Sequence, residues 1–223
     1  MMEKRRKIGI MGGTFNPIHY GHLMIAENAA EQYGLDLVLF MPNGTPPHKP
    51  DKKIVAASHR IEMIRLAIQD NPSFQLSLDE VNSGETSYTY RTLERLKEKE
   101  PEDDFYFIMG GDSLKYFDTW RYPERILRTA YVLAAIRDNV EGAEFQEYID
   151  HLNHDYEAMG VFPLNTPNFS VSSSKIRDLI QNQKTVRYML PENVREYIME
   201  HLLYRSNSSA ISRITCESCS PVT

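Results

Sequence analysis

Residues 8–22 read Ile-Gly-Ile-Met-Gly-Gly-Thr-Phe-Asn-Pro-Ile-His-Tyr-Gly-His. The apolar run at the start is typical of a buried strand, and the two glycines after it let the backbone turn and approach an anion closely. A helix is expected over His19–Tyr33, and its first N–H groups and its dipole favour a phosphate at the same place. Two glycines after a strand are weak evidence alone, but the whole string predicts a strand, a phosphate-binding turn and a helix.

Apolar β-prone runs alternate with helical patterns along the rest of the chain, which predicts an α/β fold with an open parallel sheet and helices on both faces. We expect strands near Lys7–Met11, Leu35–Met41, Phe74–Leu78, Phe105–Met109, Ala130–Ile136 and Gly160–Leu164. We expect helices near His19–Tyr33, Ala56–Asp70, Tyr88–Lys99, Ser113–Phe117, Pro123–Arg128, Phe145–Glu157, Ser174–Asn182 and Pro191–Leu202.

Size and composition limit the possible functions. The chain has 223 residues, 41% of them hydrophobic, and a net charge of −6. That charge argues against nonspecific binding of nucleic acid, which requires many cations. The sequence shows no secretory signal peptide, so we expect a cytoplasmic protein. It also has no run of about eighteen apolar residues, so no membrane span is expected. We expect one domain over residues 1–205 with a small C-terminal helical part, and a disordered tail over residues 206–223 that carries Cys216 and Cys219.

A second motif lies far along the chain. Residues 171–177 read Val-Ser-Ser-Ser-Lys-Ile-Arg, a run of hydroxyls that leads into a helix with two cations. In the first motif, His19 and His22 are three residues apart, so they occupy neighbouring positions at the start of the helix. A single histidine there would more often cap the helix or lie on the surface. The two motifs together favour a pocket for the phosphates of a nucleoside triphosphate.

Both motifs also resemble the signatures of a known superfamily. The string over residues 12–22 resembles the His-x-Gly-His signature of the nucleotidyltransferases, and residues 172–177 are similar to their second signature, Ser-Ser-Thr/Ser-x-Ile-Arg. From about Lys7 to Arg205 the chain most resembles the bacterial nicotinate-nucleotide adenylyltransferase family. The resemblance implies a Rossmann-like fold and transfer of AMP from ATP to nicotinate mononucleotide, with Mg²⁺ assisting. The products would be nicotinate adenine dinucleotide, within NAD biosynthesis, and pyrophosphate.

The resemblance assigns roles residue by residue. As catalytic groups it implies His19, His22 and Arg177. For ATP it implies contacts from Gly12, Gly13, Thr14, Phe15, Gly111, Asp112, Ser172, Ser173, Lys175 and Ile176. No dedicated metal ligand is assigned, and the sequence leaves open whether Asp112 holds Mg²⁺ through water or binds the ribose.

The acceptor half of the site depends on several weaker signals. By residue type alone Trp120 is more often a core or groove filler, but the resemblance favours stacking on a pyridine ring. Further acceptor contacts are expected from Thr86, Ser87, Tyr88, His48 and Lys49. The free N–H groups of the helix that begins near Ser87 could bind a carboxylate, which would favour nicotinate over nicotinamide. Arg121 follows Trp120 where the family often has an aromatic residue. The sequence therefore does not decide what lines that side of the acceptor pocket.

Other functions remain possible from sequence alone. The acceptor could instead be nicotinamide mononucleotide or phosphopantetheine, or the chain could be a regulator that binds nucleotide without turnover. A tRNA synthetase is set aside because no anticodon-binding domain fits in 223 residues. A homodimer is expected only because dimers are the commonest oligomers.

Overall fold

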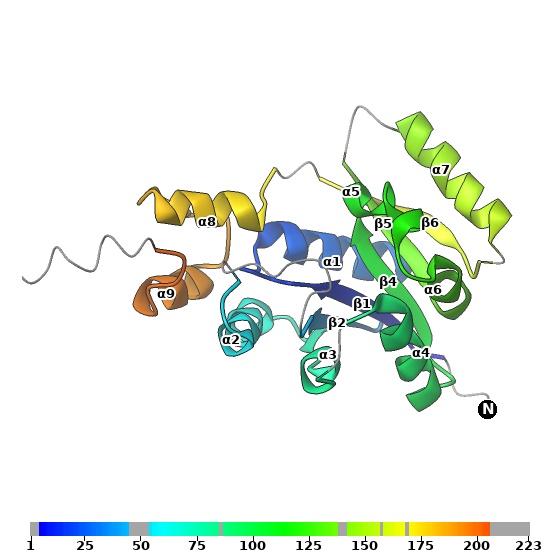
Figure 1. Cartoon of the computed structure of the whole chain (residues 1–223), viewed down its shortest axis with the longest axis horizontal. Coiled ribbons are helices and arrows are strands. Elements are labelled where there is room, and N and C mark those ends of the chain that lie inside the picture. The colour runs from blue at the N-terminus through cyan, green and yellow to red at the C-terminus, as the bar shows by residue number, and fades with distance from the viewer. Residues whose placement is uncertain are drawn as a thin grey trace, which may run out of the picture.

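The computed structural model describes residues 5–44, 54–84, 87–137, 142–156, 158–167 and 170–205. Within them six parallel strands form one sheet in the order β3-β2-β1-β4-β5-β6 (Figure 1). The strands are β1 Lys7–Gly13, β2 Leu37–Pro42, β3 Phe74–Leu76, β4 Asp104–Gly110, β5 Tyr131–Arg137 and β6 Val161–Thr166. All six predicted strands are therefore confirmed, and the strand order is that of the doubly wound Rossmann fold.

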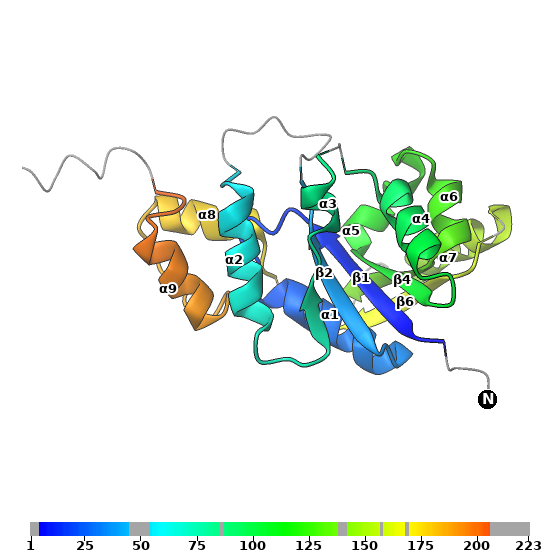
Figure 2. The same cartoon turned by 90° about the horizontal axis from the view of Figure 1, so that it is seen from below.

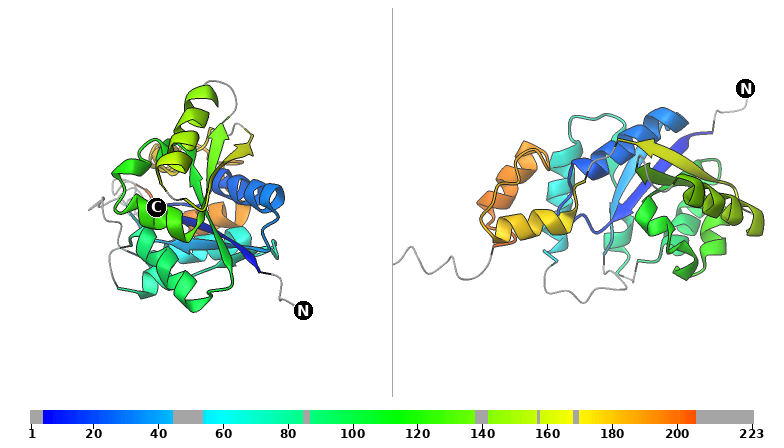
Figure 3. Two further views of the ribbon diagram at one scale, coloured as in Figure 1. Left: turned by 90° about the vertical axis from the view of Figure 1, so that its right-hand side faces the viewer. Right: turned by 90° about the horizontal axis from the view of Figure 1, so that it is seen from above.

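Helices cover both faces of this sheet, as predicted, and the views in Figures 2 and 3 show the two layers. The helices are α1 Tyr20–Tyr33, α2 Ala57–Ile68, α3 Asp79–Asn82, α4 Thr89–Lys99, α5 Gly111–Leu114, α6 Pro123–Thr129, α7 Gly142–Asp155, α8 Ser173–Gln181 and α9 Glu192–Glu200, with a 3₁₀ turn η1 over Phe117–Thr119.

The core has two halves, one on each side of the sheet. Because successive side chains of a strand point to opposite faces, β1 sends Met11 to one half and Ile10 to the other. The first half is completed by buried residues of α1, α2, α8 and α9, and the second by buried residues of α4, α6 and α7. In α1, Ala26 and Ala29 are fully buried in the first half, so this face of the helix packs on the sheet.

Two local predictions were wrong. The helix expected over Ser113–Phe117 is split into α5 and η1, and Leu114 of α5 and Phe117 of η1 are both fully buried. The strand expected to reach Leu78 ends at Leu76, and the short helix α3 follows it. Its start is marked by Ser77, whose hydroxyl accepts the N–H of Asp79, a polar turn that competes with the strand.

The order of the strands locates the functional edge of the sheet. The chain leaves β1 toward one face through α1, and leaves β4 toward the other through α5 and α6. Ligands of such sheets bind beyond the carboxyl ends of the strands at this switch point. Among the described residues no helix is long and apolar enough to cross a membrane.

Candidate active site

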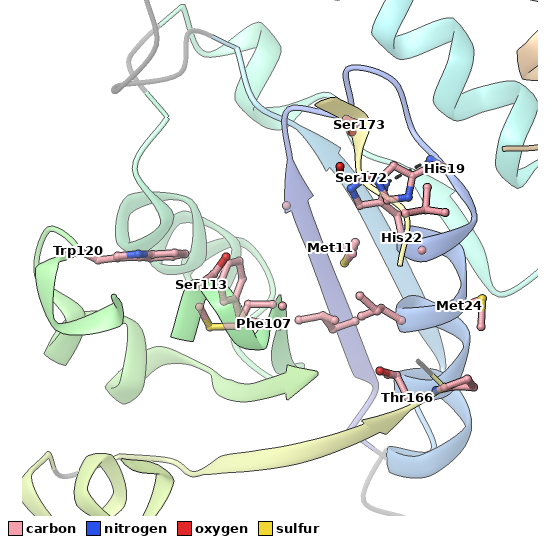
Figure 4. Close-up of a pocket in the computed structure, with 18 residues that line it drawn as sticks. Met11, His19, His22, Met24, Phe107, Ser113, Trp120, Thr166, Ser172 and Ser173 are labelled. Atoms are coloured by element: carbon pink, nitrogen blue, oxygen red, sulfur yellow. Dashed lines mark hydrogen bonds between the residues drawn. The ribbon is translucent and has the colours of Figure 1, made fainter. Parts of the chain in front are cut away.

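A cavity of about 650 Å³ opens at the carboxyl ends of β1 and β4. Figure 4 shows the two histidines at the start of α1 and the two serines at the start of α8 on one side of it, and Trp120 and Ser113 on the other. Its lining consists of Met11, Gly12, His19, Gly21, His22, Met24, Ile25, Phe107, Ile108, Met109, Gly110, Ser113, Trp120, Thr166, Pro167, Val171, Ser172 and Ser173. The two sequence motifs therefore meet in one cavity.

The two histidines form a pair at the start of α1. His19 precedes the first helical residue, and its ring stacks on that of His22 with centroids 3.8 Å apart. The backbone N–H of His19 donates to Nδ1 of His22 at 3.2 Å. Since this nitrogen accepts, the neutral ring of His22 carries its proton on Nε2.

The surroundings of His22 keep its ring neutral. Burial holds the pKa of His22 well below its usual value, and the nearby His19 lowers that pKa further. The ring of Phe15 packs edge-on against it, with centroids 5.1 Å apart. His22 is thus a fixed hydrogen-bond donor on the wall of the cavity.

Gly21 lies between the histidines for a steric reason. A Cβ atom at this position would lie 3.0 Å from Nδ1 and Cε1 of His19. Any larger residue would therefore crowd the imidazole, so the glycine in His-x-Gly-His permits the stacked pair.

The serines of the second motif organise the start of α8. The hydroxyl of Ser172 accepts the N–H of Lys175 at 3.3 Å, and the hydroxyl of Ser173 donates to the carbonyl of Pro17 at 2.8 Å. The second bond ties the late motif to the loop between β1 and α1. The first N–H groups of α8 have no partner within the helix, and they face a cavity suited to an anion.

The two cations of the second motif do not line this cavity. The side chain of Lys175 is exposed. The guanidinium of Arg177 donates to the carbonyl of Asn16 at 2.7 Å and lines a separate cavity with Tyr204 and Arg205. Arg177 thus fixes the loop that carries the first motif.

Two further predicted ATP contacts have side chains in the core. Phe15 is 2% exposed and Ile176 is fully buried. Their predicted contact with the nucleotide would therefore have to come from their backbones. His48, Lys49 and Thr86 lie outside the described residues, as does the side chain of Asp112.

The glycines after β4 have different roles. Gly110 lines the cavity, and a Cβ there would meet nothing within 4 Å. A Cβ added at position 111 would lie 2.7 Å from the carbonyl oxygen of Ala135, so Gly111 is needed for close packing on β5. Gly111 stays a predicted ATP contact, and its neighbour Gly110 is the one that lines the cavity.

Sequence reasoning missed several wall residues. Met24 and Ile25 follow Gly21 at helical spacing, so the periodicity of α1 could have identified them. Thr166 ends β6, and the rule on the carboxyl ends of strands could have found it.

No pattern in the sequence predicted a role at the site for Arg60 of α2. It is 2% exposed and donates to the carbonyls of Thr14 and Asn43, each at 3.0 Å. Arg60 thus joins the glycine turn to the end of β2 beneath the site. Thr14 also accepts a hydrogen bond from Asn43 at 3.5 Å and does not line the large cavity.

A second, smaller cavity of about 160 Å³ adjoins the first. The two share Gly12, Phe107 and Trp120, and the smaller is completed by Ile10, Gly13, Met41, Asn43, Glu80, Ser87, Thr89, Thr92 and Leu93. Trp120 is half-buried, with Phe107 packed edge-on against it at a centroid distance of 6.0 Å. It is therefore both part of the core and a wall between the two cavities.

The start of α4 closes the smaller cavity. Thr89 is the first residue of α4, and the hydroxyl of Ser87 accepts the N–H of Gly44 at 3.1 Å. Tyr88 does not line the cavity. Its hydroxyl accepts from Arg121 at 3.3 Å, and the Arg121 guanidinium lies over its ring.

Comparisons with known proteins agree with this geometry. The family described as "Cytidylyltransferase-like" matches residues 10–179. A protein of Lachnoclostridium phytofermentans named "Probable nicotinate-nucleotide adenylyltransferase" is 43% identical over 89% of this chain and 99% of its own. A protein of the same name from Bacillus pumilus is 38% identical over 90% of this chain and 100% of its own.

A solved structure shares the fold. The nicotinic acid mononucleotide adenylyltransferase of Plasmodium falciparum, in a complex with APC, matches with a TM-score of 0.72. The match covers 90% of this chain and 98% of that one at 20% identity, so it supports the fold alone. From the matched family and the two bacterial relatives, the chain belongs to the cytidylyltransferase-like family and, within it, to the nicotinate-nucleotide adenylyltransferases.

Proposed function

We propose that the chain transfers AMP from ATP to nicotinate mononucleotide. A 5′-phosphate oxygen of the mononucleotide attacks the α-phosphorus of ATP, and the bond from that phosphorus to the oxygen that bridges the α- and β-phosphates breaks. Nicotinate adenine dinucleotide forms and pyrophosphate leaves. The observation that carries the proposal is the pair of adjoining cavities, with both signature motifs on the larger one.

Catalysis in this site rests on positioning and on charge stabilisation. The attacking phosphate oxygen is already anionic at neutral pH, so no general base is needed, and positioning with charge stabilisation dominates as in other phosphate transfers. Nε2 of His22 and the start of α8 would donate to the triphosphate, together with His19 and the hydroxyl of Ser172. Ser173, whose hydroxyl donates to the carbonyl of Pro17, would contribute its backbone N–H. Such preorganised donors favour the charge that develops on the leaving pyrophosphate.

The described residues that line the large cavity include no Lys, Arg, Asp or Glu. Additional positive charge must therefore reach the nucleotide from residues outside this set. Lys175, His48 and Lys49 remain proposed phosphate contacts, with His48 and Lys49 also candidates for the acceptor. We assign Arg177 a positioning role through its bond to Asn16.

Mg²⁺ would enter with ATP. The described residues gather no group of three His, Cys, Asp or Glu side chains that could hold a metal. Mg²⁺ commonly binds through substrate phosphates and water with only one or two carboxylates, so this donor set fits a metal carried by the triphosphate. Bound there, it would neutralise phosphate charge.

The acceptor base would enter the smaller cavity. Trp120 would stack on the pyridine ring, and the free N–H groups at the start of α4 would bind the carboxylate. The amide NH₂ of nicotinamide is itself a hydrogen-bond donor, so it would meet these N–H donors without forming a bond. Buried polar groups would then be left unpaired. Equal kcat/KM for nicotinate and nicotinamide mononucleotide would exclude this basis of selectivity.

One assay tests the function. Pyrophosphate release from MgATP is measured with nicotinate mononucleotide, nicotinamide mononucleotide and phosphopantetheine as acceptors. The proposal predicts the highest kcat/KM with nicotinate mononucleotide. ATP binding without release on any acceptor would instead identify a nucleotide-binding regulator.

A further inference from the structure

The smaller cavity contains a buried carboxylate that the reaction described above does not use. Glu80 of α3 is 8% exposed and lines the cavity. Its Oε1 accepts the hydroxyl of Thr92 at 2.8 Å. Its backbone carbonyl accepts the hydroxyl of Ser83 at 2.8 Å, so both ends of this residue are fixed.

No positive side chain compensates this carboxylate within the described part of the chain. Glu80 forms no ion pair there, and the described lining of the smaller cavity holds no Lys, Arg or His. A buried negative charge without a partner is costly for a folded protein. A ligand with a positive charge would remove that cost.

The other walls specify the shape of the expected ligand. Trp120 and Phe107 supply aromatic surfaces, which attract cations placed over their faces. Thr89 brings the start of α4, an eleven-residue helix whose first N–H groups favour an anion. The cavity therefore suits a flat ligand that carries one positive and one negative group.

The proposed acceptor has this distribution of charge. In a pyridine mononucleotide the ring nitrogen is bonded to the ribose, so the ring carries a fixed positive charge at every pH. In the nicotinate form a negative carboxylate is attached to the same ring.

We propose that Glu80 is a specificity-determining residue that recognises the positive charge of the pyridinium ring. This inference rests on the proposed function. It implies that the site selects oxidised over reduced mononucleotides, because reduction to the dihydropyridine removes the ring charge. The reacting 5′-phosphate is the same in both forms, so a difference in kcat/KM reports recognition of the ring.

The test compares nicotinate mononucleotide with its 1,4-dihydro form as acceptors. Pyrophosphate release is measured near pH 8, where dihydropyridines are stable, with the unaltered protein, Glu80→Gln and Ser83→Ala. Glutamine keeps the shape of the side chain and an oxygen for Thr92 but removes the charge. Ser83→Ala removes the hydrogen bond to the Glu80 carbonyl without changing the charge, so it controls for loosening of α3.

The unaltered protein should prefer the oxidised acceptor by about thirtyfold or more in kcat/KM. Glu80→Gln should reduce this preference by about thirtyfold, the least that loss of one partner of a buried charge pair commonly costs. The loss should appear as a higher KM for the oxidised acceptor, with kcat nearly unchanged, and Ser83→Ala should retain the preference.

Three results would overturn the inference. If Glu80→Gln lowers kcat/KM equally for both acceptors, Glu80 has only a structural role. If the unaltered protein turns over both forms equally well, the cavity does not recognise the ring charge and the proposed function still stands. If it turns over neither form, the proposed function fails, and this inference fails with it.

Discussion

At the scale of single residues, His22 offers the sharpest test of the chemistry. Its Nε2–H is fixed by the bond from the His19 backbone to Nδ1. We predict that His22→Ala lowers kcat for pyrophosphate release by about 10²–10³, the usual loss for one preorganised donor. Tyr20→Phe, on the exposed side of the same turn, is the control and should retain activity. Near-normal kcat in His22→Ala would remove His22 from the mechanism.

The lowered pKa of His22 also predicts a pH dependence of stability. Unfolding restores the ordinary pKa near 6.5, so below that pH the unfolded chain binds a proton that the folded chain excludes. The contribution of His22 is therefore complete above about pH 6.5 and is lost as the pH falls. Between pH 7.5 and 5.5 the loss should reach at most about 1.4 kcal/mol.

Urea denaturation at these two pH values measures the effect. His22→Asn cannot titrate, so its free energy of unfolding should fall less than that of the unaltered protein over this interval. Equal pH dependence in both proteins would show that His22 titrates normally in the folded state.

Gly110 and Gly111 form a matched pair for a test of packing. Alanine at 111 would bring Cβ against the carbonyl of Ala135, so we expect a loss of about 1–3 kcal/mol in stability. Alanine at 110 meets nothing within 4 Å, and the φ of −73° there suits any residue. Gly110→Ala should therefore keep its melting temperature while its methyl group raises the KM for ATP. Equal destabilisation by both substitutions would contradict this assignment.

At the scale of elements, strands were easier to predict than short helices. Buried parallel strands read as continuous apolar runs, such as Leu-Val-Leu-Phe-Met in β2, so all six were found. The four residues of α3 and the three of η1 are too few to show a helical period. Their positions depend on contacts with distant parts of the chain, such as the bond from Thr92 to Glu80.

The start of α8 supports a prediction at this scale. Ser172→Ala removes the hydroxyl that accepts the Lys175 N–H, which should cost about 1 kcal/mol in unfolding free energy. Because the same helix start faces the large cavity, the KM for ATP should rise as well. Chemical denaturation and steady-state kinetics measure the two effects. Gln181→Ala, an exposed position at the far end of α8, is the control, and a similar loss there would exclude a capping role for Ser172.

At the scale of the whole molecule, the sheet explains why distant motifs meet. All six strands are parallel, so the residues that follow them gather at one edge, and Gly12 and Thr166 line one cavity. Sequence reasoning could therefore place the histidines and serines together. It could not place Arg177, because a long side chain can reach either the cavity or the carbonyl of Asn16, and only the packed loop decides.

The acceptor side was harder to predict for a related reason. Trp120 carried a recognisable signal, whereas Glu80 and Arg60 are single charged residues in ordinary helical sequence. Their burial results from the packing of α3 and α2 against the end of β2, which no local pattern encodes.

The most direct test of the account is a crystal structure of the protein with a non-hydrolysable ATP analogue and Mg²⁺. We predict the triphosphate between Nε2 of His22 and the first N–H groups of α8, with the adenosine in the part of the large cavity formed by Gly110 and Thr166. A nucleotide bound elsewhere, or a triphosphate that contacts only one of the two motifs, would contradict the joint phosphate site.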